Sequence, residues 1–165
     1  MKSINILRAI VFATAAAYLI FVQNHSVTTG MLVLQYVSVA IAFGSLVLFK
    51  IDSSEEKYRS TVAPGAIAAA VGIFALFSGS TLATFTLLVA VFAAANAVAE
   101  FALSTKSKSS DKLELRISAA IGILTSVVFA FGQLDDLNAV GFFSAYLSVL
   151  AVQRAIWLAS PKQKD

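Results

Sequence analysis

Residues 31–49 read MLVLQYVSVAIAFGSLVLF, a run of nineteen residues without a charged side chain. A helix needs about 20 mostly apolar residues to cross a hydrocarbon core roughly 30 Å thick. This stretch therefore predicts a membrane-spanning helix, and it sets the frame for the rest of the chain.

Five further stretches have the same character, and they cover residues 4–22, 62–77, 81–103, 117–133 and 137–158. The composition agrees with this pattern. Of the 165 residues, 59% are apolar and 13% are charged, and the mean hydropathy is +0.86. Soluble domains average about 25% charged residues. We therefore expect an all-α integral membrane protein in which residues 1–165 form a single domain of six transmembrane helices.

The first stretch has a second interpretation as a cleavable signal peptide. Lys2 and Arg8 precede or begin the apolar run, and the small residues of 15–17 resemble a cleavage site. The apolar run nevertheless continues to Val22, and cleavage would leave an odd number of helices. These features favour a retained first helix.

The connections between the six stretches alternate in charge. All twelve Lys and Arg residues lie at the N-terminus, around 50–61, around 104–116 or near the C-terminus, whereas 23–30, 78–80 and 132–138 contain none. Short loops rich in Lys and Arg remain cytoplasmic. Both termini are therefore expected inside the cell, with the basic segments beside anionic lipid headgroups. The net charge of +3 then reflects membrane orientation and not nucleic-acid binding.

Three segments of nearly equal length, 8–50, 62–103 and 116–158, each contain two of the expected helices and one short outer turn. We expect three antiparallel hairpins, which would be parallel repeats related by a pseudo-threefold axis along the membrane normal. The plainer alternative is that any six-helix protein with short loops divides into hairpins. Pro64 is expected in the first turn of the third helix, where a missing N–H is harmless.

Small residues recur at three- or four-residue spacing on four of the expected helices. Such residues allow helix backbones to approach closely in lipid. They are Ala9, Ala13 and Ala17; Ala68 and Gly72; Ala90, Ala93, Ala94 and Ala97; and Ser118, Gly122, Ser126 and Ala130. We interpret them as helix–helix contact faces and not as binding sites.

Ionisable groups inside a membrane span are costly and suggest a functional site. Glu100 and Arg154 lie about one turn from the inner ends of the fourth and sixth helices, at similar depth, so they could pair. Asn96 precedes Glu100 by four residues and shares its helix face. These three residues form a candidate intramembrane polar cluster. It would be either a proton- or solute-responsive site, or a structural ion pair in which Arg154 extends to the headgroups.

On the outer side, His25, Asp135 and Asp136 are candidate pH-responsive groups. A histidine can titrate between pH 5 and 8, and adjacent carboxylates can gain protons in mild acid. The alternative is that these residues only solvate and terminate turns.

Motifs of enzymes are missing from the sequence. It contains no cysteine, a single histidine, no phosphate-binding glycine loop and no zinc signature. We therefore expect a non-catalytic protein without a cofactor or a bound metal.

The segment from Gly65-Ala66-Ile67 through Leu76-Phe77-Ser78 to Ala99-Glu100-Phe101 resembles the hairpin repeated in the HdeD-like family of small six-helix bacterial inner-membrane proteins. A looser second copy runs from Arg116 to Arg154-Ala155-Ile156-Trp157. The resemblance implies a bacterial inner membrane and an association with stress or acid resistance, and it brings no catalytic residues.

The expected function is that of a non-catalytic inner-membrane protein, tied to stress or acid tolerance or acting as an accessory subunit of a larger membrane assembly. Its partner would be a membrane protein or further copies of the chain. The alternative is a small channel or transporter for protons or a small solute that uses Asn96, Glu100 and Arg154. An intramembrane enzyme is a third possibility, which no constellation of residues supports.

Overall fold

The computed structural model describes residues 2–51, 55–105, 107 and 109–159, and the side chains of all these except 2, 51, 55–61 and 109–111. The described residues form six α-helices and no strand. The helices are α1 (Lys2–Phe21), α2 (Val27–Ile51), α3 (Glu55–Phe77), α4 (Leu82–Ser104), α5 (Ser109–Phe131) and α6 (Asp136–Ala159). The basic residues Lys106, Lys108, Lys162 and Lys164, which contribute to the expected orientation, lie outside the described residues.

Five of these helices, all except α3, are long and apolar enough to cross a membrane by length and composition. The apolar part of α3 is shorter and covers Val62–Phe77. The expectation of an all-helical chain with several membrane-spanning helices is therefore confirmed at this level.

The third and fifth helices begin earlier than expected. The sequence predicts starts at 62 and 117, where the apolar runs begin, whereas α3 begins at Glu55 and α5 at Ser109. Glu, Lys and Arg favour helices, so a helix continues beyond the apolar stretch wherever such residues precede it. As a result, Pro64 lies in the interior of α3 and not in its first turn. Its missing N–H leaves the carbonyl of residue 60 without the usual helical hydrogen bond.

The three turns between α1 and α2, α3 and α4, and α5 and α6 end in the same N-cap. The side chains of Ser26, Thr81 and Asp135 accept hydrogen bonds from the backbone N–H three residues later, at 3.3, 3.2 and 2.7 Å. Each bond satisfies a helix-terminal donor. These caps recur at spacings of 55 and 54 residues.

The helices that precede these turns also end alike. The last residues of α1, α3 and α5 are Phe21, Phe77 and Phe131, with exposed fractions of 84%, 88% and 82%. Exposed aromatic rings at the ends of apolar helices are typical of residues that lie at a membrane–water interface.

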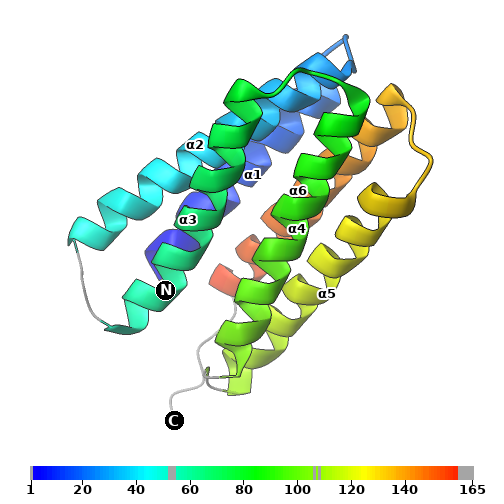
Figure 1. Ribbon diagram of the computed structural model, residues 1–165. Helices are drawn as coiled ribbons and strands as arrows, with labels where there is room; N and C mark the ends of the chain where they lie inside the picture. Colours follow the sequence, from blue (N-terminus) through cyan, green and yellow to red (C-terminus); the bar gives the residue numbers. More distant parts are fainter. Residues whose placement is uncertain (1, 52–54, 106, 108, 160–165) are drawn as a thin grey trace.

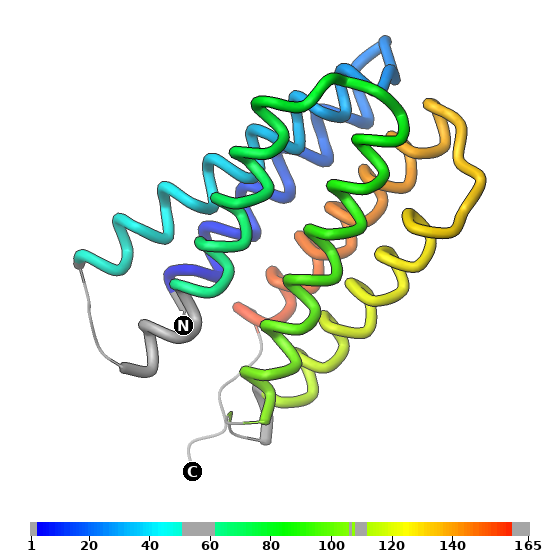
Figure 2. The backbone as a smooth tube through the Cα atoms, viewed as in Figure 1, coloured from blue at the N-terminus to red at the C-terminus, as the bar shows by residue number. Residues whose placement is uncertain are grey.

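Figure 1 shows the six helices in one bundle, with consecutive helices running in opposite directions. Helices α2, α4 and α6 each contact the other two. The closest packing joins α4 with α5, α2 with α3, and α1 with α6, so it pairs helices of different expected hairpins (Figure 2). An interhelical hydrogen bond supports one of these pairs, because the Gln35 amide of α2 donates to the Ala75 carbonyl of α3 at 2.8 Å. A second one joins α6 to α5, where the Gln153 amide donates to the Glu114 carbonyl, also at 2.8 Å.

Small residues explain why these pairs approach closely. A Cβ added to Gly122 on α5 would lie 2.9 Å from both the Ala93 carbonyl oxygen and the Ala97 Cβ on α4. A Cβ on Gly72 of α3 would lie 3.0 Å from Ser38 on α2. The expected small-residue faces of α3, α4 and α5 thus serve as contacts inside the bundle. The expectation is wrong for α1, because Ala13 and Ala17 are exposed and Ala9 is only half-buried.

The half of the bundle next to the capped turns has an apolar, aromatic core. The ring of Phe85 is buried and makes edge-to-face contacts with Phe143 and Phe129, at centroid distances of 5.6 and 6.3 Å. It lies so close to Gly30 that a Cβ there would be 2.8 Å from the ring. Large side chains therefore fill this half, and the polar groups described next lie toward the other end.

Candidate functional site

Glu100 is the centre of the candidate site. It lies near the C-terminal end of α4 and is buried, with an exposed fraction of 2%. Arg8 from α1 donates through Nη2 to Glu100 Oε1 at 2.8 Å. Arg154 from α6 donates through Nη2 to the same oxygen. We call Arg8, Glu100 and Arg154 the buried ion cluster, and it joins three helices.

Two neighbouring groups extend this cluster. Ser118 on α5 accepts a hydrogen bond from Arg154 Nη2 at 3.1 Å. The Arg8 guanidinium lies 5.7 Å from the ring centroid of Phe12, within the range of a cation–π interaction. The cluster therefore connects α1, α4, α5 and α6, and one carboxylate oxygen is its shared acceptor.

The charges of the buried ion cluster do not balance. Two guanidiniums face one carboxylate, and the two arginines are only 5% and 3% exposed. The Nε atoms of both arginines have no hydrogen-bond partner in the described part of the chain. Buried charges are stable only when they are paired and hydrogen-bonded. Chemically, the arrangement holds helices together and leaves an excess of positive charge beside Glu100.

Of the three residues that the sequence predicts for the cluster, Glu100 and Arg154 contact each other, whereas Asn96 bonds its own helix. The structure brings Glu100 and Arg154 together and buries Arg154, so this side chain does not extend to the headgroups as one interpretation expected. Asn96 is also buried, but its amide donates to the carbonyl of Phe92 on its own helix at 2.8 Å. No hydrogen bond between Asn96 and Glu100 occurs among the described residues.

Arg8 is the member that sequence reasoning missed. It was expected among the basic residues that flank the membrane on the cytoplasmic side, whereas the structure buries it against Glu100. A signal was available, because Arg8 lies inside the apolar run that begins at Ile4. Ser118 was expected only as part of a helix contact face, and it also binds Arg154.

The outer candidates lie at the opposite end of the bundle. Asp135 caps α6, and its Oδ2 also accepts from the Asn138 amide at 3.0 Å. Asp136 is the exposed first residue of α6, where a negative charge interacts favourably with the helix dipole. His25 is half-buried and lines a shallow hollow together with Leu19 and Ser148. Among the described residues no ion pair joins His25 to either aspartate, so these three groups do not form one site.

The described residues contain no group of three or more His, Asp or Glu side chains that could hold a metal ion. Among the described residues, the charged side chains that are buried are those of the buried ion cluster, Arg8, Glu100 and Arg154. Searches with this chain find no matching family model, no matching curated protein and no matching solved structure.

Proposed function

We propose that this chain is a non-catalytic, multi-pass protein of a bacterial inner membrane that does not conduct ions and that acts as an accessory subunit of a membrane assembly or in stress and acid tolerance. The observation that carries the proposal is the packed aromatic core next to the capped turns. The resemblance to HdeD-like proteins supports the stress-related part.

Large apolar side chains close the centre of the bundle next to the capped turns. Phe85, Val89, Phe92 and Phe143 come from the central helices α4 and α6, and each is at most 1% exposed. Channels and transporters need a path lined by hydrogen-bonding or charged groups, or a gate that opens to water. A core filled with large apolar side chains, with Gly30 pressed against Phe85, offers neither.

The proposed topology has three hairpins with both termini in the cytoplasm. The alternation of basic and uncharged connections supports the orientation. The three equivalent N-caps and the exposed terminal phenylalanines support parallel repeats about an axis along the membrane normal. In this placement, α3 crosses the membrane with the shortest apolar length, which the bilayer accommodates by local thinning.

A second candidate is a small transporter for protons or a small solute. It is favoured by the charge imbalance of the buried ion cluster. Uncompensated charge at membrane depth is costly, and such costly groups suggest a functional site. This function would require the aromatic half of the core to open.

Purified protein reconstituted into liposomes separates the two candidates. We expect proton and chloride fluxes, measured with an internal pH dye and a chloride electrode, to equal those of protein-free liposomes. A flux that depends on the protein would overturn the proposal, and its loss in Arg154→Met protein that remains folded by circular dichroism would favour the transporter. Purification in mild detergent, with identification of co-purifying membrane proteins, tests the accessory role.

A further inference from the structure

The buried ion cluster contains one more positive charge than its own residues neutralise. Arg8 and Arg154 both bind Glu100, and these three side chains are 5%, 3% and 2% exposed. Among the described residues no further charged side chain is buried. A buried charge without a counter-charge is strongly unfavourable, and at membrane depth it suggests a functional site. The folded bundle therefore favours a second negative charge beside the two guanidiniums.

The two arginines also have hydrogen-bond donors that no described residue uses. A guanidinium carries five N–H groups and no acceptor. The three hydrogen bonds of Arg8 and Arg154 to described residues all use Nη2, and two of them share Glu100 Oε1, so the two guanidiniums are adjacent. Both Nε atoms are buried without an acceptor in the described part of the chain. Helices α1 and α6 thus each contribute a buried cationic donor to the same place.

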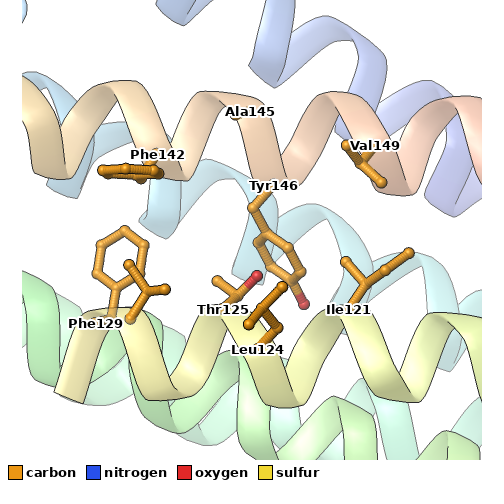
Figure 3. A pocket seen from close by; sticks show the side chains of 9 residues that line it. Ile121, Leu124, Thr125, Phe129, Phe142, Ala145, Tyr146 and Val149 are labelled. Atoms are coloured by element: carbon orange, nitrogen blue, oxygen red, sulfur yellow. The ribbon is translucent and has the colours of Figure 1, made fainter. Parts of the chain in front are cut away.

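The groups around the cluster do not supply the second negative charge. Phe12 contributes a ring face and Ser118 a neutral hydroxyl. Tyr146 lies within electrostatic range of all three charged members, and its neutral phenol points from α6 toward α5 in a groove of about 300 Å³ between these helices (Figure 3). Glu114, one turn before Ser118 on α5, forms no ion pair with either arginine in the part of the chain that the structure describes.

We propose that the buried ion cluster binds one small monovalent anion of about the size of chloride, held by the Nε–H groups of Arg8 and Arg154. Together with Glu100, the anion balances the two guanidiniums, so the cluster becomes neutral. Hydrogen bonds between ionised partners are roughly twice as strong as those between neutral groups. The anion then links α1 to α6 in addition to the ion pairs with Glu100.

Charge and burial define the class of this ligand. A water molecule could accept from the same donors, but it would leave the excess charge in an interior of low dielectric constant. A divalent anion would reverse the imbalance. The small exposed fractions of Arg8 and Arg154 exclude phospholipid headgroups, which carry glycerol and acyl chains. The inference goes beyond the proposed function and does not rest on it, since a fixed counter-ion requires neither a partner protein nor a conduction path.

Equilibrium dialysis of the purified protein in detergent tests the site directly, with radioactive chloride as the probe after removal of chloride by dialysis against sodium gluconate. We expect saturable binding of about one chloride per chain. Arg154→Met keeps the Arg8–Glu100 pair and should bind none, and Arg8→Met is a second test variant with the same expected loss. Arg116→Gln is the matched control, because it removes one positive charge from an exposed position and should bind like the parent protein.

Three results of this dialysis overturn the proposal. They are the absence of saturable binding by the parent protein, an equal loss of binding in Arg116→Gln, and retained binding in both methionine variants. Circular dichroism of every variant shows that it is folded, so a loss of binding is assigned to the site and not to unfolding.

Unfolding measures the same site in a second way, with sodium chloride replacing sodium gluconate at constant ionic strength. A ligand that binds only the folded state lowers the equilibrium constant of unfolding about tenfold for each tenfold rise of its concentration above the dissociation constant. We expect this dependence in the parent protein and Arg116→Gln, but not in Arg154→Met. A constant that does not change with chloride in the parent protein contradicts the proposal. The liposome fluxes expected above do not depend on chloride binding, so the two proposals fail independently.

Discussion

Replacement of Glu100 by Gln should be the most destabilising single change in the buried ion cluster. Glutamine keeps the size of the side chain but removes the only negative charge that the arginines share. The guanidiniums of Arg8 and Arg154 would then face each other in the interior without a counter-ion from the chain. Since Glu100 is 2% exposed and the arginines are 5% and 3% exposed, solvent does not screen this repulsion.

The size of the effect follows from the charge balance. Removing one partner of a buried ion pair costs about 3–5 kcal/mol, because it leaves an uncompensated buried charge. Arg154→Met instead leaves the Arg8–Glu100 pair at 2.8 Å and removes the excess positive charge. It loses the bond to Ser118, which contributes about 1 kcal/mol. We therefore expect Arg154→Met to cost about 2 kcal/mol or less, clearly below Glu100→Gln.

Reversible unfolding by SDS in mixed micelles, followed by circular dichroism, measures these differences in the free energy of unfolding. Arg116→Gln is the control, because Arg116 is exposed near the beginning of α5 and should change stability by less than about 0.5 kcal/mol. A free energy of unfolding of Glu100→Gln within about 1 kcal/mol of that of the parent protein would contradict the role of Glu100 as the shared counter-ion. Equal destabilisation by Arg154→Met and Glu100→Gln would contradict it as well.

Three further predictions concern packing, capping and topology. Gly122→Ala should destabilise the protein by about 1–3 kcal/mol in the same SDS titration, since its Cβ would lie 2.9 Å from the Ala93 carbonyl oxygen. Gly141→Ala is the control and should be neutral or stabilising, because there is open space around this glycine. Asp135→Ala should lower the free energy of unfolding by about 1 kcal/mol through loss of the α6 N-cap. Asp136→Asn does not remove that hydrogen bond and should lower it less; equal losses of stability would contradict the capping role of Asp135. A phosphatase reporter that works only in the periplasm should be inactive when fused to the C-terminus and active when inserted after Gly79; the reverse pattern would contradict the proposed orientation.

Much of the helical architecture was predictable, because membrane insertion depends on the hydropathy of one segment at a time. The stretch 31–49 and its five counterparts each correspond to an observed helix. The boundaries on the polar side were less accurate. The helices α3 and α5 start at Glu55 and Ser109, since helix propensity does not end where hydropathy falls. Pro64 therefore lies in a helix interior and not in a first turn.

The candidate site was predictable only in part. An Arg and a Glu at similar depth on two apolar helices indicate a possible pair, and Glu100 and Arg154 do form one. Asn96 shares the helix face of Glu100, but its amide donates to the carbonyl of Phe92 on its own helix. Residue spacing does not show whether such an amide bonds a neighbouring side chain or the backbone of its own helix. Arg8 was expected in the cytoplasmic flank. A residue four positions after the start of an apolar run can lie either in that flank or inside the membrane span.

Hydropathy and charge, which act locally and add along the chain, are sufficient to give the helical class, the approximate spans and an expected orientation. The choice of neighbours depends on the shape of side chains that are distant in sequence. Gly122 against Ala93 and Ala97 makes α4 and α5 the closest pair, and the looser packing of α5 on α6 opens the groove at Tyr146. Only the folded bundle brings Arg8, 92 residues away in the chain, to Glu100, because such contacts depend on the rotation and packing of whole helices.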